Sequence, residues 1–432
     1  MKRWILILLF LAGAVLPSAA EQRFIVRNKL GLTGIQLVCA MLHCTPGQSL
    51  GDPSGQLFLV TSDDLINLNS FLTPPLGQLG VVNVEIDQQL DLGGPFATSI
   101  PETLTDSQLI SYYGAPIWNG YANQPASQIL RLSAAQNTFH VSGAGTVAMI
   151  DTGVDTGHPA LSAILLPGYD FTNNTPNADE TGDLNHSSAA VLDGGPSEAL
   201  FVNPSTLAIV GPAAASLLGG GPYSGFGHGT MTAGIVHLVA PTAKILPLKA
   251  FDSDGSGYLS NIVRAAYYAV GHGSKVISMS FSFDSSSKEL VQAINYANSK
   301  GVICVASAGN GGNSVLVYPA ALTHVMAVAS TTDYDTRSSF SSYGSDVWVA
   351  APGEGVVSTY PYGTYSAGWG TSFSAPFVAG TAALLVDVSS AVNPQTAAQA
   401  IAHARWISND MGNGRLDTYN SVQAWTAVSG AH

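Results

Sequence analysis

The sequence predicts an α/β domain in which a mostly parallel sheet is covered by helices on both faces, preceded by a small α+β domain. Short continuous apolar runs, such as residues 147–150 and 302–306, are typical of strands buried on both faces. Helical patterns fall between these runs, as in strand–helix–strand units. The chain has 432 residues, 46% of them hydrophobic and only 10% charged. That is enough chain and apolar surface for one large core and a second, smaller one.

The large domain is expected to begin near residue 112 and to extend to residue 432. Its expected strands are 147–150, 244–249, 276–280, 302–306 and 325–328, and its expected helices are 231–238, 262–270, 289–299 and 377–385. Ligands of parallel sheets bind at the carboxyl ends of the strands. Asp151, Ser280 and Asn310 follow three such ends, so chemistry is expected there. Segment 171–226 is rich in Asn, Asp, Gly, Pro and Ser, which predicts a long surface insertion.

Residues 21–90 are expected to form the small α+β domain. Its expected strands are 23–27, 57–60 and 81–87, and its expected helices are 32–42 and 64–72, the second ending at Pro74-Pro75. The pattern weakens after this domain. Residues 91–111 are rich in Gly, Pro, Ser and Thr and are expected to form a linker.

Residues 1–20 have the composition of a secretory signal peptide. Lys2-Arg3 is followed by an apolar stretch at 4–16 and by Ser18-Ala19-Ala20, a small-x-small cleavage site. The alternative is a membrane anchor, but the apolar stretch is too short to span a bilayer comfortably. No later segment is expected to reach spanning length without interruption by polar residues. We therefore expect an exported, soluble protein with no membrane association after the signal is removed.

The net charge excludes some classes of binding partner, and the cysteine positions indicate which thiols could pair. The net charge of −13 makes nucleic acid and anionic membranes poor partners. Among the three cysteines, Cys39 and Cys44 are close enough in sequence to pair, although spacing alone leaves this open. Cys304 lies in a predicted buried strand, which favours a small packed side chain over a reactive thiol.

The stretch Gly370–Pro376 opens a long apolar run that predicts a buried helix. Pro376 is expected in the first turn, where its missing N–H has no intrahelical partner. Ser372 would then lie at a helix N-terminus, where free N–H groups and the helix dipole favour developing negative charge. Serine also caps ordinary helices, so a nucleophile needs further support from a base and an oxyanion donor.

Three other residues could supply that support. His228 lies between two glycines ahead of a predicted helix, which leaves its ring uncovered. Asp151 ends a predicted buried strand, where an isolated Asp could equally form a turn. Asn310 lies in a glycine turn after another strand, which alone would be an ordinary Asn-Gly turn. Serine catalysis needs these four kinds of group together.

In chain order, Asp151-Thr-Gly, Gly227-His228-Gly-Thr, Ala308-Gly309-Asn310 and Gly370-Thr-Ser372 resemble the motifs of the subtilisin-like serine proteases. The resemblance extends from about residue 112 to about residue 425. It implies that Ser372 is the nucleophile, His228 the general base and then acid, and Asp151 the orienting carboxylate. It also implies an oxyanion hole formed by Asn310 and the Ser372 backbone N–H.

The resemblance also implies how a substrate would be held. An extended protein or peptide would lie between two strand edges of the family. The residues that match these edges and the pocket beside them are Gly255, Ser256 and Gly257, then Ser278, Met279, Ser280 and Phe281, then Ala308 and Gly309. Residues 21–90 resemble the family's propeptide by pattern only, which implies an intramolecular inhibitor that is cut off within 91–111.

The sequence departs from the family pattern in a few places. Met231-Thr232 follows the histidine motif where the family usually has a histidine and a small or apolar residue, with no expected loss of chemistry. Asp151 and His228 are 77 residues apart, because the 171–226 insertion lies between them. Gly311 leaves the first specificity pocket uncharged, which points weakly to apolar residues before the scissile bond.

Three alternatives concern function and ions. An esterase of the Gly-x-Ser-x-Gly type is disfavoured because Ser374 replaces the last glycine and the triad order is Asp, His, Ser. A catalytically silent binding protein of the same fold remains open. No cofactor is needed for the chemistry. Residues 252–255 do not match a calcium loop, and the Asp-rich segment 170–193 is either a structural calcium site or a solvated loop. We expect a monomeric exported endopeptidase.

Overall fold

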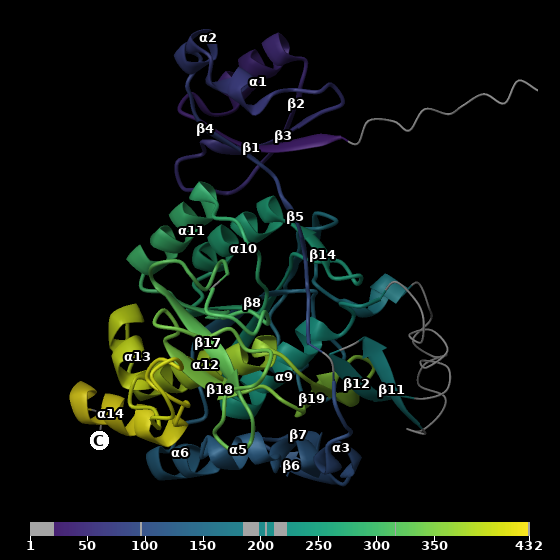
Figure 1. Ribbon diagram of the computed structural model, residues 1–432, viewed down its shortest axis with the longest axis vertical. Helices are drawn as coiled ribbons and strands as arrows, with labels where there is room; N and C mark the ends of the chain where they lie inside the picture. Colours follow the sequence, from purple (N-terminus) through teal and green to yellow (C-terminus); the bar gives the residue numbers. More distant parts are fainter. Residues whose placement is uncertain are drawn as a thin grey trace, which may run out of the picture. The chain divides into compact units, whose positions relative to one another are not determined.

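The computed structural model describes residues 21–95, 97–184, 198–203, 205–210, 223–315 and 317–430 (Figure 1). The expected signal peptide at 1–20 lies outside the described residues. The chain divides into two compact units. Among the described residues, unit 1 comprises those up to Ser49 together with Pro53–Ile86, and unit 2 comprises Leu50–Asp52 and those from Asp87 onwards.

Unit 1 is a four-stranded antiparallel sheet in the order β2-β3-β1-β4, packed against one helix. Its strands are β1 (Gln22–Asn28), β2 (Thr45–Ser49), β3 (Leu57–Ser62) and β4 (Val81–Ile86), and its main helix is α1 (Gly31–Leu42). Alternate residues of β1 and β3 reach the core, where Phe24 and Val60 pack against Ile35 and Val38 of α1. These strands and this helix were expected, apart from β2.

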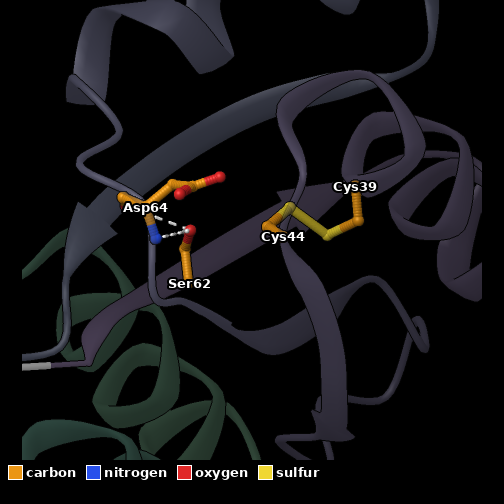
Figure 2. Close-up of a disulfide and its surroundings, with 4 residues drawn as sticks. All are labelled: Cys39, Cys44, Ser62 and Asp64. Atoms are coloured by element: carbon orange, nitrogen blue, oxygen red, sulfur yellow. Dashed lines mark hydrogen bonds between the residues drawn. A yellow bond between two sulfur atoms is a disulfide. The ribbon is translucent and has the colours of Figure 1, made fainter. Parts of the chain in front are cut away.

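The end of α1 brings the first two cysteines together (Figure 2). His43 adopts the left-handed conformation (φ 55°), which turns the chain back so that the Cys44 N–H donates to Cys39 O at 3.2 Å. The two sulfur atoms then form a disulfide. The pairing that the sequence left open is therefore present.

The second expected helix of unit 1 is wrong in extent. After β3, the Ser62 Oγ accepts a hydrogen bond from Asp64 N at 3.1 Å and holds the chain in a turn (Figure 2). Only η1 (Leu68–Leu72) is helical, as a 3-10 turn, after Asn67 accepts from Asn69 N. Pro74-Pro75 does not end a helix but begins α2 (Pro74–Gln78), because the first helical positions need no N–H donor.

Unit 2 contains the predicted parallel sheet, in the order β10-β9-β13-β8-β15-β16-β17-β18. All neighbours are parallel except β9 and β10. The strands are β8 (Thr146–Asp151), β9 (Tyr169–Asp170), β10 (Thr175–Pro176), β13 (Lys244–Lys249), β15 (Val276–Met279), β16 (Ile303–Ser307), β17 (Val325–Thr331) and β18 (Val349–Pro352). The apolar runs fold this way because both faces of the sheet are covered.

Helices cover both faces of this sheet (Figure 1). The four that pack on it are α9 (His228–Val239), α10 (Leu259–Gly271), α11 (Lys288–Ser299) and α12 (Thr371–Val388). Peripheral helices are α3 (Glu102–Thr105), α4 (Asn119–Ala122), α5 (Pro125–Ile129), α6 (Leu132–Phe139), α13 (Pro394–Ile401) and α14 (Thr418–Ser429). The predicted fold class is confirmed.

Helix α12 differs from its expectation in two ways. It begins at Thr371, so Pro376 lies inside the helix and not in its first turn. It is also long and apolar enough to pass for a membrane span by length and composition, which was not expected because polar residues interrupt the apolar run. In the structure, 89% of that apolar window is buried, as in the core helix of a folded domain.

Two segments expected to be irregular contain regular structure. Within 171–226, η2 (Thr181–Leu184) and the hairpin β11 (Glu198–Asn203)–β12 (Thr206–Val210) are described, while residues 185–197, 204 and 211–222 are not. β12 pairs with β20 (Thr364–Gly368), which pairs with β19 (Val356–Tyr360), so the segment completes a second sheet. The expected linker at 91–111 begins at the last residue of β5 (Gln89–Asp91). It contains α3 and most of β6 (Leu109–Tyr112), which pairs with β7 (Ala115–Trp118).

Candidate active site

Asp151 and His228 meet because a strand ends where a helix begins. Asp151 is the last residue of β8 and His228 the first of α9, and His228 Nδ1 lies 2.7 Å from Asp151 Oδ1. The other contacts of the carboxylate are Thr152 N at 2.8 Å and Thr232 Oγ1 at 3.0 Å. Thr232, one of the departures from the family pattern, thus helps to fix the carboxylate.

Opposing effects act on the imidazole. Burial lowers the pKa of His228, but the charge and hydrogen bond of Asp151, together with the charge of Glu180, raise it above its usual value. Asp151 therefore does two things: it fixes which ring nitrogen carries the proton, and it favours the imidazolium. Both are what a general base needs from its carboxylate partner.

Ser372 lies in the first turn of α12 and is joined by two hydrogen bonds to Ser280, the residue after β15. Its Oγ donates to Ser280 O at 3.1 Å, and the Ser280 Oγ donates back to Ser372 O at 2.8 Å. The Ser372 carbonyl is free for this bond because Pro376, four residues on, has no N–H. The His228 ring is near the same turn, with its centroid 5.5 Å from that of Phe373. Among the described residues no hydrogen bond joins Ser372 Oγ to His228.

The Asn310 amide is oriented by the helix that carries Ser372. Its Oδ1 accepts from Thr371 N at 2.9 Å and from Thr371 Oγ1 at 3.0 Å. The Thr371 hydroxyl in turn accepts from Gly309 N at 3.2 Å. The amide oxygen is thus occupied on the helix side, and the Nδ2 hydrogens remain to donate to a ligand beside Ser372.

One of the two expected substrate edges is already paired, by the chain itself. β14 (Ser256–Tyr258) forms an antiparallel ladder with β5, and Leu92 N donates to Gly255 O at 2.8 Å. Gly255, Ser256 and Gly257 therefore face residues 90–92, which lie on them as an added strand.

The second edge requires a correction. Ser278 and Met279 are paired with β8 on one side and β16 on the other, so their backbones have no group left for a substrate. Only Ser280 and Phe281, which follow the end of β15, lie beyond this pairing. The resemblance placed the edge two residues too early, because the sequence does not show where a central strand stops.

The segment that pairs with β14 continues to the helix that carries Ser372. A side chain on Gly370 would meet the Asn310 amide nitrogen and Pro95 Cδ, each 3.5 Å from the position of the missing Cβ. Further on, Pro101 Cγ lies 3.1 Å from the corresponding position of Gly355. Residues 88–95 thus run from β14 to the N-terminus of α12. Phe96 lies outside the described residues.

Comparisons with known proteins show the family of this chain. The model of the subtilase family matches residues 143–422. The chain is 35% identical to thermitase of Thermoactinomyces vulgaris over 68% of this chain and 94% of thermitase. It is 37% identical to a thermophilic serine proteinase of Bacillus sp. (strain AK1), over 64% of this chain and 61% of that protein. The chain belongs to the subtilase family.

One solved structure shows the same fold over most of the chain. Fervidolysin from Fervidobacterium pennivorans, described as a keratinolytic enzyme related to subtilisin, matches with a TM-score of 0.69 and 20% identity. The match covers 94% of this chain and 61% of fervidolysin. The protein is a subtilisin-like serine endopeptidase, as the sequence predicted.

The subtilase site includes a buried acid that the sequence reading missed. Glu180, from the segment predicted as a surface insertion, is fully buried and accepts hydrogen bonds from the residues around Asp151 and His228. It lies in Asn177-Ala-Asp-Glu180-Thr, which has no pattern that distinguishes a site residue from a polar loop. No local signal could have found it.

The expected calcium segment is only partly described. Asp170 accepts hydrogen bonds from Thr172 and Asn173, and Asp183 pairs with Lys249 at 2.8 Å. Within the described parts of the chain, no group of three or more His, Cys, Asp or Glu side chains is arranged to hold a metal ion. Residues 185–193 of the expected segment lie outside the description.

Proposed function

We propose that Asp151, His228 and Ser372 are the catalytic triad of this endopeptidase, with Asn310 and the Ser372 N–H as its oxyanion hole. The observation that supports this most is the 2.7 Å contact between His228 and Asp151 at the N-terminus of α9, beside the first turn of α12. Neither a cofactor nor a metal enters the chemistry.

The reaction follows from these groups. Ser372 Oγ attacks the peptide carbonyl carbon while its proton passes to His228 Nε2, and the carbonyl oxygen becomes an oxyanion held by Asn310 Nδ2. His228 then gives that proton to the leaving amine as the C–N bond breaks, leaving an acyl-enzyme. Water, deprotonated by the same nitrogen, hydrolyses the ester and restores Ser372. To start, the Ser372 hydroxyl must rotate from Ser280 O towards His228.

Neutral His228 is the form that accepts the proton. Because Asp151 and Glu180 raise its pKa above the usual value, the active fraction increases with pH through a value above 6.5. The peptidase activity of this chain is therefore expected to be highest at neutral to alkaline pH.

We propose further that the enzyme is exported, acts as a monomer on protein or peptide substrates and cleaves its own N-terminal region. Support for self-processing comes from residues 89–92, which pair with β14 as a substrate strand would, and from Pro95, which lies beside Gly370. On this path the scissile bond lies between Gly94 and Thr98. Unit 1 and the segment that follows it up to the scissile bond would then be the propeptide, with β5 as its inhibitory strand.

The test is expression of the wild type beside Ser372→Ala in a host deficient in proteases. The wild type should shorten, with a new N-terminus within residues 95–98, and should cleave casein and react with a serine-directed phosphonate. The Ser372→Ala chain should stay full length and do none of these. Identical maturation of both chains would refute self-processing. A wild type that neither cleaves casein nor reacts with the phosphonate would favour a catalytically silent binding protein.

A further inference from the structure

Glu180 lies at the centre of a hydrogen-bond network that joins both halves of the proposed acid–base pair. It follows β10 and precedes η2 in the sequence, and it is fully buried (0% exposed). Its Oε2 accepts from Thr152 Oγ1 at 2.9 Å and from Gly227 N at 3.0 Å. Its Oε1 accepts from Thr230 N at 3.1 Å and from the Thr230 hydroxyl. Thr152 follows Asp151, while Gly227 and Thr230 flank His228.

These bonds also fix the two threonine hydroxyls. Because each hydroxyl donates its only proton to Glu180, each oxygen is left to accept. Thr152 Oγ1 accepts from Gly229 N at 2.9 Å, and Thr230 Oγ1 accepts from Asp155 N at 2.8 Å. The loop after β8 and the first turn of α9 are thus tied together through one carboxylate.

Four donors converge on this group, and that number selects for a carboxylate. An ionised glutamate has about four acceptor positions, whereas a glutamine has two and presents an NH₂ group to the remaining donors. Glutamine would leave buried donors without partners, which is costly. An ionised glutamate can therefore satisfy all four donors at this position, which a glutamine cannot.

Several titratable groups surround Glu180. Burial raises the pKa of Glu180 to about 7, although the bonds from Thr230, Thr152 and Gly227 and the charge of Lys249 lower it. The buried Lys249 amine is itself held by Thr152 O at 2.8 Å and by Asp183. The groups that face Glu180 or interact with it electrostatically are Lys249 of β13, with its partner Asp183 of η2, His228 of α9, Tyr360 of β19 and Tyr362.

We propose that Glu180 is a positioning residue of this protease, a buried carboxylate whose hydrogen bonds hold the Gly227–Thr230 turn, and with it His228, against the Asp151–Thr152 loop. It does not touch the substrate. The proposal rests on the catalytic role proposed for His228, and it assigns to the 171–226 segment a part in catalysis beyond its place in the second sheet.

The first test is the pH profile of Glu180→Gln. Loss of the negative charge should lower the pKa of His228, so the acid limb of kcat/KM should move to lower pH by at least about half a unit. Loss of the fixed turn should reduce kcat by about 10- to 100-fold with KM changed less than twofold. Glu180→Asp keeps the charge and should restore the acid limb towards the wild-type position, although its shorter side chain leaves kcat reduced.

The matched control is Glu289→Gln. Glu289 is also fully buried in unit 2 but lies on α11 and accepts from Gln292 at 3.2 Å, outside this network. The Glu289→Gln substitution should leave the acid limb of the kcat/KM profile at its wild-type pH. If Glu180→Gln retains both the kcat and the acid limb of the wild type, the proposal is wrong. The same holds if Glu289→Gln moves the limb equally, because the effect would then reflect any buried glutamate.

A second measurement does not depend on activity or maturation. In full-length Ser372→Ala protein with labelled histidine, the imidazole titration of His228 can be followed by NMR, with His228→Asn to assign the signal. Glu180→Gln should lower the His228 pKa, and an unchanged value would overturn the proposal even if the protein proved not to be a protease. Should Glu180→Gln fail to fold, Thr152→Val and Thr152→Ser serve instead. Val should reduce kcat at unchanged KM and Ser should restore it, while equal activities would overturn the proposal.

Discussion

At the scale of single residues, His237 shows how a buried titratable group sets the acid stability of unit 2. The Tyr121 hydroxyl donates to Gly234 O at 2.6 Å, so its oxygen must accept, and His237 Nδ1 lies 3.0 Å from it as the donor. This leaves a neutral imidazole in a buried site, 2% exposed. Burial and the neighbouring His158 lower the pKa of His237 to about 3.

The sign of the pH effect follows directly. The folded protein binds this proton less readily than the unfolded chain, whose histidine titrates near 6.5. The stability that neutral His237 contributes is therefore complete above pH 6.5 and is lost as the pH falls from there towards about 3. Between pH 7.5 and pH 5 the loss should be about 2 kcal/mol.

His237→Gln should remove this loss. Urea unfolding of the inactive Ser372→Ala protein at both pH values is the measurement, so that self-digestion does not interfere. The drop in unfolding free energy between pH 7.5 and pH 5 should be smaller by about 2 kcal/mol in His237→Gln. The exposed His403 provides the control, since His403→Gln should keep the drop of the parent protein. Equal drops in all three proteins would contradict the assignment.

At the scale of elements, the site depends on two helices that begin side by side. α9 starts with His228 and α12 carries Ser372 in its first turn, and the two helices pack against each other. The close approach occurs at Gly380. A Cβ there would lie 2.6 Å from Val239 Cβ and 3.3 Å from Val236 O. Glycine is needed here for space and not for its backbone conformation.

Gly380→Ala should therefore destabilise the protein, against the usual helix preference for alanine of about 1 kcal/mol. Separation of the helices should cost about 1–3 kcal/mol and reduce kcat, because His228 and Ser372 move apart. Thermal unfolding and peptide hydrolysis are the measurements. Gly271→Ala at the end of α10 is the control, since a Cβ there meets nothing within 4 Å and should be neutral or stabilising. A Gly380→Ala protein as stable as the control would show that the helices adjust freely.

The same elements show what local sequence can and cannot determine. Continuous apolar runs identified β8, β13, β15, β16 and β17, because strands buried on both faces have no polar positions to confuse the pattern. β5 was missed because Gln89–Asp91 is a strand only through its partner β14. The start of α12 was placed too late because its first turn, with Ser372 and Ser374, is polar in sequence although buried in the structure.

At the scale of the whole molecule, the grouping of the motifs could be predicted from the sequence because the carboxyl ends of parallel strands lie at one edge of a sheet. Asp151 is the last residue of β8 and Asn310 follows β16, so their position at the same edge of the sheet follows from the topology. Glu180 could not be anticipated in this way. Its partners come from β8, from α9 and from a long segment without periodicity, and their meeting depends on loop conformations that the sequence pattern does not encode.

The two units also differ in how they are stabilised, which gives a last prediction. Among the described residues the Cys39–Cys44 disulfide belongs to unit 1, and unit 2 contains the free, buried Cys304. A loop with a sequence separation of 5 residues is short.

Closing this loop with the disulfide should stabilise unit 1 by about 2 kcal/mol, because the unfolded chain loses entropy. If unit 1 is the propeptide, the double substitution Cys39→Ala/Cys44→Ala should slow self-processing in a pulse–chase experiment. The mature enzyme should keep its melting temperature and its activity, with or without a reducing agent. Cys304→Ala, in contrast, should lower the melting temperature of the mature enzyme, because it leaves a small cavity at β16. A mature enzyme that loses stability in the double variant would contradict the removal of unit 1.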